Sequence, residues 1–134
     1  MEFDFGGGNS AQISNDDKIQ LQLIRQRFST ARTSPCDLQF EREDGRVLNA
    51  FVHSDRAWLL FRYDKGDAGF STRDPDYVGP EDAMLTYTLE NGQQDEYPTS
   101  WTIPIEEAIR VVQYFSRTGD KATWLLWHND QNWI

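Results

Sequence analysis

Among its 134 residues the sequence has a single cysteine, Cys36. An internal disulfide bond and a cysteine-rich zinc site are therefore excluded. No hydrophobic run approaches the roughly 18 residues that a membrane-spanning helix needs. The N-terminus also lacks the basic and then apolar pattern of a signal peptide. These absences lead us to expect a protein of a reducing, cytoplasmic compartment that makes no membrane contact.

Basic residues are also scarce, with 13 Lys and Arg against 22 Asp and Glu. The net charge of −9 argues against nucleic-acid binding, which depends on Lys and Arg, and against attraction to anionic lipid. The whole excess lies in residues 64–107, which hold 11 acids and 2 bases, whereas the rest of the chain holds 11 of each. Such a segment is either a solvated surface that maintains solubility or a docking surface for a basic partner.

The chain is predicted to form a flexible leader over residues 1–12, because of its Gly6-Gly7-Gly8 run, and one domain over residues 13–134. Phe3 and Phe5 of the leader are the residues that can still add a short edge contact. Ser14 or Asn15 is expected to cap a first helix that ends at Ser34-Pro35. Apolar residues follow one helical face of this segment, at Leu21, Ile24, Phe28 and Ala31.

Alternating apolar and polar residues predict strands over 36–43, 46–53 and 57–63, the first two joined by the turn signal Asp44-Gly45. Because the strand at 57–63 is apolar on both faces, we expect it in the middle of the sheet. Shorter strands are predicted at 70–72, 84–90 and 93–97, the last two joined at Asn91-Gly92.

A second helix is predicted to begin at Pro104, with Glu106 and Glu107 in its first turn, and to end at Gly119. A final apolar strand is expected over residues 123–128. The order of elements indicates an α+β fold, with a mainly antiparallel sheet of about six to seven strands, an N-terminal helix and a helix before the last strand.

Motifs for catalysis are weak throughout the sequence. The Gly6-Gly7-Gly8 run lacks the Lys-Ser/Thr of a phosphate-binding loop. His53 and His128 have no histidine partner at helical spacing, so a metal site is not expected. Cys36 has no surrounding signature of a nucleophile, and acidic pairs such as Asp95-Glu96 are expected by chance in so acidic a chain. We predict no catalytic residues, no cofactor and no enzymatic activity.

Five tryptophans are many for this length. Trp58, Trp124 and Trp127 lie in apolar strands and are predicted to be core residues. Trp101 lies between polar residues, so it either folds over the core or serves as an exposed binding anchor. Tyr77, between Pro75 and Gly79, has the same two possible roles.

Several motifs occur in a distinctive order, namely Asn91-Gly92-Gln93-Gln94-Asp95-Glu96-Tyr97-Pro98, Ile103-Pro104-Ile105-Glu106-Glu107-Ala108, Tyr114-Phe115-Ser116-Arg117-Thr118-Gly119 and Leu126-Trp127. Together with the turn Asp67-Ala68-Gly69, this order resembles the Imm1 family of bacterial immunity proteins over residues 64–127. Members of that family commonly carry a proline after the Thr-Gly turn, where this chain has Lys121-Ala122-Thr123.

The resemblance implies a protein of the bacterial cytoplasm that binds the catalytic domain of a polymorphic toxin one-to-one and neutralises it. The toxins that members of this family neutralise are chiefly zinc-dependent cytosine deaminases, related to the deaminase that acts on double-stranded DNA. Such an enzyme needs a basic groove for phosphate and a pocket for the base, so an acidic protein in the groove blocks both.

Binding surfaces must differ between cognate pairs, so the candidates for toxin binding are acids and loop aromatics of the acidic segment. They are Asp64, Asp67, Asp74, Asp76, Tyr77, Glu81, Asp82, Asp95, Glu96 and Trp101. Two alternatives remain open. One is an acidic module for another basic partner, such as a nuclease toxin, which a neighbouring toxin gene would distinguish. The other is a small acidic enzyme, which a metal or cofactor retained on purification would reveal.

Overall fold

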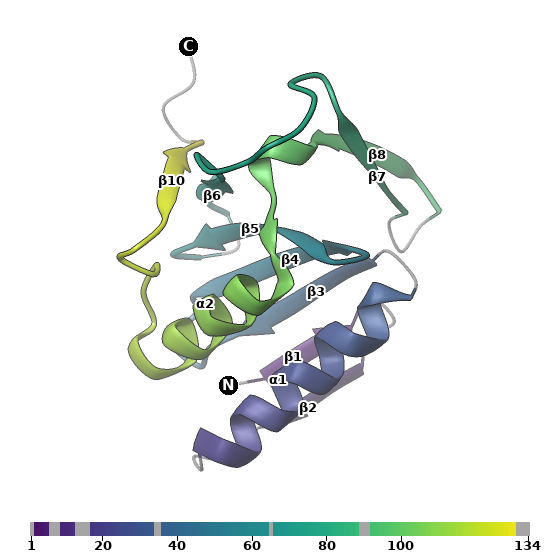
Figure 1. Cartoon of the computed structure of the whole chain (residues 1–134). Helices are drawn as coiled ribbons and strands as arrows, with labels where there is room; N and C mark the ends of the chain where they lie inside the picture. Colours follow the sequence, from purple (N-terminus) through teal and green to yellow (C-terminus); the bar gives the residue numbers. More distant parts are fainter. Residues whose placement is uncertain are drawn as a thin grey trace.

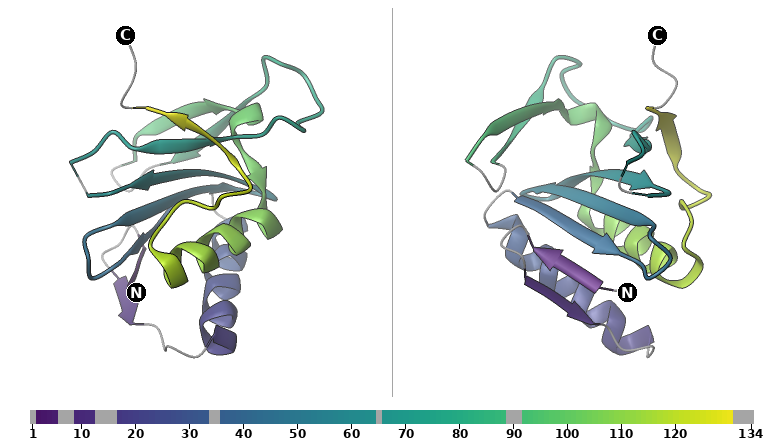
Figure 2. Two further views of the ribbon diagram at one scale, coloured as in Figure 1. Left: turned by 90° about the vertical axis from the view of Figure 1, so that its left-hand side faces the viewer. Right: turned by 180° about the vertical axis from the view of Figure 1, so that it is seen from behind.

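A computed structural model describes residues 2–5, 9–12, 17–33, 36–64, 66–88 and 92–130 of the chain. In this part of the chain, two helices pack on one face of an antiparallel sheet, and a separate β-hairpin lies against the other face (Figures 1 and 2). The predicted α+β class is therefore confirmed.

Within the described residues the main sheet has eight strands, in the order β10-β6-β5-β4-β3-β1-β2, with β9 pairing beside β5. Its strands are β1 (Glu2–Phe5), β2 (Asn9–Gln12), β3 (Cys36–Glu41), β4 (Val47–His53), β5 (Arg56–Arg62), β6 (Phe70–Arg73), β9 (Ile103–Pro104) and β10 (Leu126–Asn129). The hairpin consists of β7 (Met84–Thr88) and β8 (Gln94–Pro98), and a short 3-10 helix, η1 (Thr99–Trp101), leads from it to β9.

The N-terminal segment differs from the sequence prediction. The sequence indicates a flexible leader over residues 1–12 with at most a short edge contact at Phe3 and Phe5, whereas β1 and β2 pair with each other and β1 also pairs with β3. The alternation Glu-Phe-Asp-Phe is that of a strand, and in the register Glu2–Phe5 lies opposite Leu38–Glu41. The sheet thus extends beyond the domain predicted to start at residue 13. The Gly6-Gly7-Gly8 run and the expected cap at Ser14 or Asn15 lie outside the described residues.

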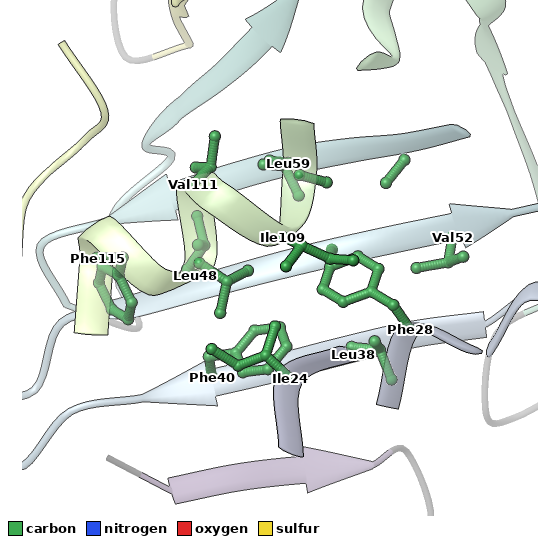
Figure 3. Close-up of a cluster of buried hydrophobic side chains, with 14 of the residues drawn as sticks. Ile24, Phe28, Leu38, Phe40, Leu48, Val52, Leu59, Ile109, Val111 and Phe115 are labelled. Carbon is green, nitrogen blue, oxygen red and sulfur yellow. The ribbon is translucent and has the colours of Figure 1, made fainter. Parts of the chain in front are cut away.

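The main core lies between the sheet and the helices α1 (Asp17–Arg32) and α2 (Ile105–Thr118). Ile24 and Phe28 of α1 are fully buried, as the apolar spacing predicts, and Phe28 stacks on Phe40 of β3. Figure 3 shows side chains of β3, β4 and β5 meeting those of both helices. Because successive strand residues alternate between faces, Leu59 and Phe61 point into this core while Trp58 lies on the other face.

Helix α2 follows its sequence signals closely. It begins at Ile105, one residue after the predicted position, with Pro104 preceding its first turn. Gly119 ends the helix with a φ of 76°, and its N–H donates to the carbonyl of Phe115 at 2.7 Å. At the other end of the helix, the Ile105 N–H donates to the Asp55 carbonyl at 3.0 Å, and this bond holds the first turn, with Glu106 and Glu107, beside the start of β5.

The last strand was only partly predicted. β10 covers Leu126–Asn129 instead of residues 123–128, and Trp124 lies before it with 49% of its surface exposed. The prediction of Trp124 as a core residue is therefore wrong. β10 pairs only with β6 at the edge of the described sheet, so Trp127 packs on the core while Leu126 points outward and is 54% exposed.

Candidate functional site

The main sheet divides along β5, and the candidate site lies at this division. β5 pairs with β6 at Leu60 and Phe61, but with β9 at Arg56 and Ala57. Thr72 joins the diverging strands, since its buried hydroxyl accepts from the Leu59 N–H at 3.1 Å and donates to the Trp101 carbonyl at 3.0 Å. The C-terminal end of β6 therefore contacts η1, while β9 pairs with the other end of β5.

Arg56 holds the strands on the two sides of this division together. Its guanidinium donates to the Asp74 carboxylate at 2.7 Å and to the Thr102 hydroxyl at 2.6 Å. The Asp74 side chain is only 12% exposed, so this ion pair is partly shielded from water. The Asp74 N–H also donates to the Ser100 carbonyl, which fixes the start of the following loop on η1.

The acidic loop, defined here as Asp74–Ala83, links β6 to β7 and runs over the top of the molecule in Figure 1. The second carboxylate oxygen of Asp74 accepts from the N–H of Asp76, and the Tyr77 N–H donates to the Asp74 carbonyl. The Tyr77 hydroxyl donates to the Pro80 carbonyl at 3.1 Å, and its ring lies 5.7 Å from the Arg56 guanidinium carbon. These contacts order the loop without a partner.

Beside the loop lies a hollow of about 490 Å³, which we call the loop hollow. Its walls come from the acidic loop, from β9, from the first turn of α2 and from the segment leading into β10. Exposed apolar side chains gather here: of the five large exposed hydrophobic residues in the described part of the chain, Val78, Trp124 and Leu126 line this hollow. Isolated exposed hydrophobic residues are ordinary, but a cluster in a depression is typical of a binding site.

The structure brings together half of the ten sequence candidates. Asp76, Glu81 and Asp82 are exposed on the acidic loop, and Tyr77 is half-buried against it. Asp74 belongs to the same loop, but its carboxylate is engaged with Arg56 and the loop backbone. Three carboxylates of this loop, those of Asp76, Glu81 and Asp82, are therefore presented to solvent.

The other acidic candidates lie on different elements. Asp64 and Asp67 occupy the turn between β5 and β6, at the opposite end of β6 from the acidic loop, and Asp64 accepts there from the Gly66 N–H. Asp95 and Glu96 lie on β8, in the hairpin. The acidic segment of the sequence is thus divided in space between this turn, the loop, the hairpin and the first turn of α2.

Trp101 lies in an aromatic cluster on the sheet face opposite the helices. Its ring centroid is 5.7 Å from that of Trp58, and the Arg73 guanidinium carbon lies 3.9 Å above it. The Tyr97 ring of β8 packs on Trp58 with centroids 4.2 Å apart and ring planes tilted by 33°, a contact that joins the hairpin to the sheet. Burial raises the pKa of Tyr97, and the nearby Asp95 carboxylate raises it further. These contacts favour the packing alternative for Trp101 over the exposed anchor.

Of the residues that line the loop hollow, only Asp74, Asp76 and Tyr77 were candidates from the sequence. The exposed apolar residues Val78, Trp124 and Leu126 were not, and neither was Glu107. Val78 was overlooked as a single apolar residue in a loop, although it is 95% exposed. The uniformly apolar run 124–127 predicts one strand, with Trp124 in the core, and so hides the exposure of Trp124 and Leu126. In β10, exposed Leu126 alternates with half-buried Trp127, but this exposure follows from the pairing of β10 with β6 at the sheet edge, which the local sequence does not specify.

In the described part of the chain, no group of three or more His, Cys, Asp or Glu side chains is placed to hold a metal ion. His128 instead contacts the Asp130 carboxylate at 2.6 Å, in an exposed position. A search of the helices among the described residues finds none that is long and apolar enough to cross a membrane.

Comparison with curated proteins gives no match. The family model described as immunity protein Imm1, by contrast, matches residues 7–129, which include both helices and all the strands from β2 to β10. That range contains the acidic loop, the hairpin and the loop hollow. The chain belongs to the Imm1 family of immunity proteins.

Proposed function

We propose that this chain binds the catalytic domain of a cognate bacterial toxin one-to-one and neutralises it by covering its basic substrate groove and active site. The toxin is a nucleic-acid cytosine deaminase. Membership of an immunity-protein family supports the neutralising role. The resemblance of residues 64–127 to immunity proteins against deaminase toxins supports the choice of toxin.

The observation that carries the proposal is the confinement of the net charge of −9 to residues 64–107. Within that segment Asp64, Asp76, Glu81, Asp82, Glu96 and Glu106 are exposed. A deaminase must attract phosphate to reach its base, so its substrate groove is positively charged. Acids that face such a groove occupy the positions that phosphates would take, and they raise the rate of encounter.

Neutralisation by occlusion needs no chemistry from the immunity protein. A toxin whose groove is filled cannot admit the flipped base to its zinc-activated water, whatever the state of the zinc site. A nuclease toxin with a basic groove would be blocked in the same way, and the chemistry of the toxin separates the two cases.

The test is co-expression of this chain with the toxin domain encoded beside its gene. We expect both proteins to co-purify with one copy of each, and cytosine deamination by the toxin to be lost. After separation in denaturant and refolding, the toxin should have its original mass and recover activity. A covalent change or a cleavage of the toxin that persists after separation would overturn inhibition by binding alone. Inhibition of DNA cleavage, without any deamination in the free toxin, would assign a nuclease partner.

A further inference from the structure

Trp124 is the most unusual residue of the loop hollow. It is a half-exposed tryptophan that is nevertheless held in one orientation. Its indole N–H donates to the Glu107 carboxylate at 2.7 Å, and its ring meets Tyr114 edge-on with centroids 5.3 Å apart. A large ring that is already fixed loses little conformational entropy on binding, which is the property of an interface anchor.

Val78 of the acidic loop and Leu126 of β10 line the same hollow and add further exposed apolar surface to it. The acidic loop is fixed by Asp74, Arg56 and Tyr77, so the apolar surface is preformed. A preformed depression that combines exposed apolar side chains, one tryptophan and charged groups is suited to a protein side chain that inserts from a partner.

The charged groups around the hollow are of two kinds. The two arginines, Arg56 and Arg73, are held in its walls: Arg56 pairs with Asp74, while Arg73 lies on the Trp101 ring and donates to the Thr72 carbonyl. Asp76 and Glu107 are the acids on its rim whose carboxylates are not paired with these arginines, and Glu81 and Asp82 follow on the same loop. The charge offered to a partner is therefore negative, next to apolar surface.

We propose that the loop hollow is the docking surface for the toxin, and that it receives a loop of the toxin's catalytic domain in which a lysine or arginine adjoins an apolar side chain. The apolar side chain packs on Trp124, Val78 and Leu126, while the cation meets Asp76 and Glu107. This inference rests on the proposed function. It assigns the central contact to the hollow and not to the hairpin acids Asp95 and Glu96.

The test uses the full chain and an inactivated catalytic domain of the toxin encoded beside its gene, with affinity measured by calorimetry. Trp124→Ala should weaken binding at least about thirtyfold, the range of an interface hot spot. Val78→Arg should weaken it at least about tenfold, because a cation then faces a cation. Since Val78 is 95% exposed, that substitution leaves the fold intact and keeps the test independent of stability.

Matched controls lie on other parts of the surface. Met84→Arg changes a 46% exposed apolar residue of β7, and Glu43→Lys reverses an exposed acid in the β3–β4 turn, at the far end of α2 from the hollow. Both should bind the toxin within about twofold of the original chain.

The outcomes separate this inference from the proposed function. If the original chain does not bind the toxin, both fail. If it binds and Trp124→Ala and Val78→Arg have no effect, the docking surface is wrong while the immunity function stands. Loss of binding in Glu96→Lys alone would move the surface to the hairpin. A dimer of this chain that Val78→Arg dissociates would make a second copy the occupant of the hollow, and would also overturn the proposal.

Discussion

Replacing Trp101 and Trp124 one at a time by alanine should separate stability from binding. Trp101 packs on Trp58 and beneath Arg73, whereas Trp124 projects into the loop hollow. Truncating a fully buried tryptophan costs about 3–5 kcal/mol, so the half-buried Trp101 should lose roughly 2 kcal/mol by its packing. The loss of the Arg73 contact adds about 0.5–1 kcal/mol.

For a domain of this size, 1 kcal/mol shifts the melting temperature by about 3–4 °C. We therefore expect Trp101→Ala to melt roughly 8–12 °C below the original chain, with its toxin affinity little changed while folded. Trp124→Ala loses one edge contact with Tyr114 and one hydrogen bond, and should melt within about 6 °C of the original. Its affinity should fall at least about thirtyfold.

Both variants are to be measured by thermal denaturation and, at a temperature where each is folded, by calorimetry with the toxin domain. A Trp101→Ala variant with an unchanged melting temperature and a thirtyfold loss of affinity would refute the assignment. Trp101 would then be the binding anchor, which is the second role that the sequence left open for it, and Trp124 would not contribute to the interface.

Three further outcomes are expected. Reversing the exposed acids of the acidic loop together should slow association several-fold at low salt and weaken its salt dependence, as stopped-flow mixing will measure; unchanged association rates would make them a solvated surface. The residues concerned are Asp76, Glu81 and Asp82, and Asp74 is left in place because it pairs with Arg56. Burial, and then the Asp95 carboxylate, raise the pKa of Tyr97, so the folded state favours the neutral phenol. The contribution of the neutral phenol to stability is complete below pH ~10 and is lost as pH rises through the raised pKa. Denaturant titrations should therefore show a smaller alkaline loss of stability in Tyr97→Phe, and identical pH profiles would count against this coupling. Gly69→Ala should destabilise the chain by about 1–3 kcal/mol in urea, because Gly69 has a φ of +86° and a Cβ there would collide with the Phe61 carbonyl; an unchanged midpoint would contradict that strain.

Local signals were sufficient for the elements that depend on near neighbours. α2 follows from Pro104, Gly119 and its apolar spacing, and the β3–β4 hairpin follows from Asp44-Gly45, where Gly45 has a φ of +92°. The central position of β5 also follows from its two apolar faces. In each case the residues that decide the structure lie within a few positions of one another.

The features that were missed depend on contacts between distant segments. For β1 the sequence indicated at most a short edge contact at Phe3 and Phe5, because the Gly6-Gly7-Gly8 run suggested a leader and the partner strand β3 lies more than thirty positions along the chain. β9 has only two residues and exists because β5 exchanges partners there. The exposure of Trp124 and Leu126 follows from the edge position of β10, which no local pattern specifies.

The same distinction holds for the candidate site. The solvent-exposed acids Asp76, Glu81 and Asp82 were predictable, because each lies within two residues of a proline in a loop, where charged side chains remain hydrated. The loop hollow was not predictable, because its walls come from segments between residues 56 and 126 that meet only at the division of the sheet. The engagement of Asp74 by Arg56 was hidden for the same reason.

Competition between this chain and DNA for the toxin tests the central claim most directly. A fluorescent DNA substrate is bound to the inactivated toxin domain, and the immunity protein is added while the anisotropy of the DNA is followed. If the immunity protein covers the basic groove, one equivalent should release the DNA completely, and the Trp124→Ala variant should need a far higher concentration. A ternary complex, in which the toxin holds the DNA and the immunity protein together, would contradict occlusion of the groove.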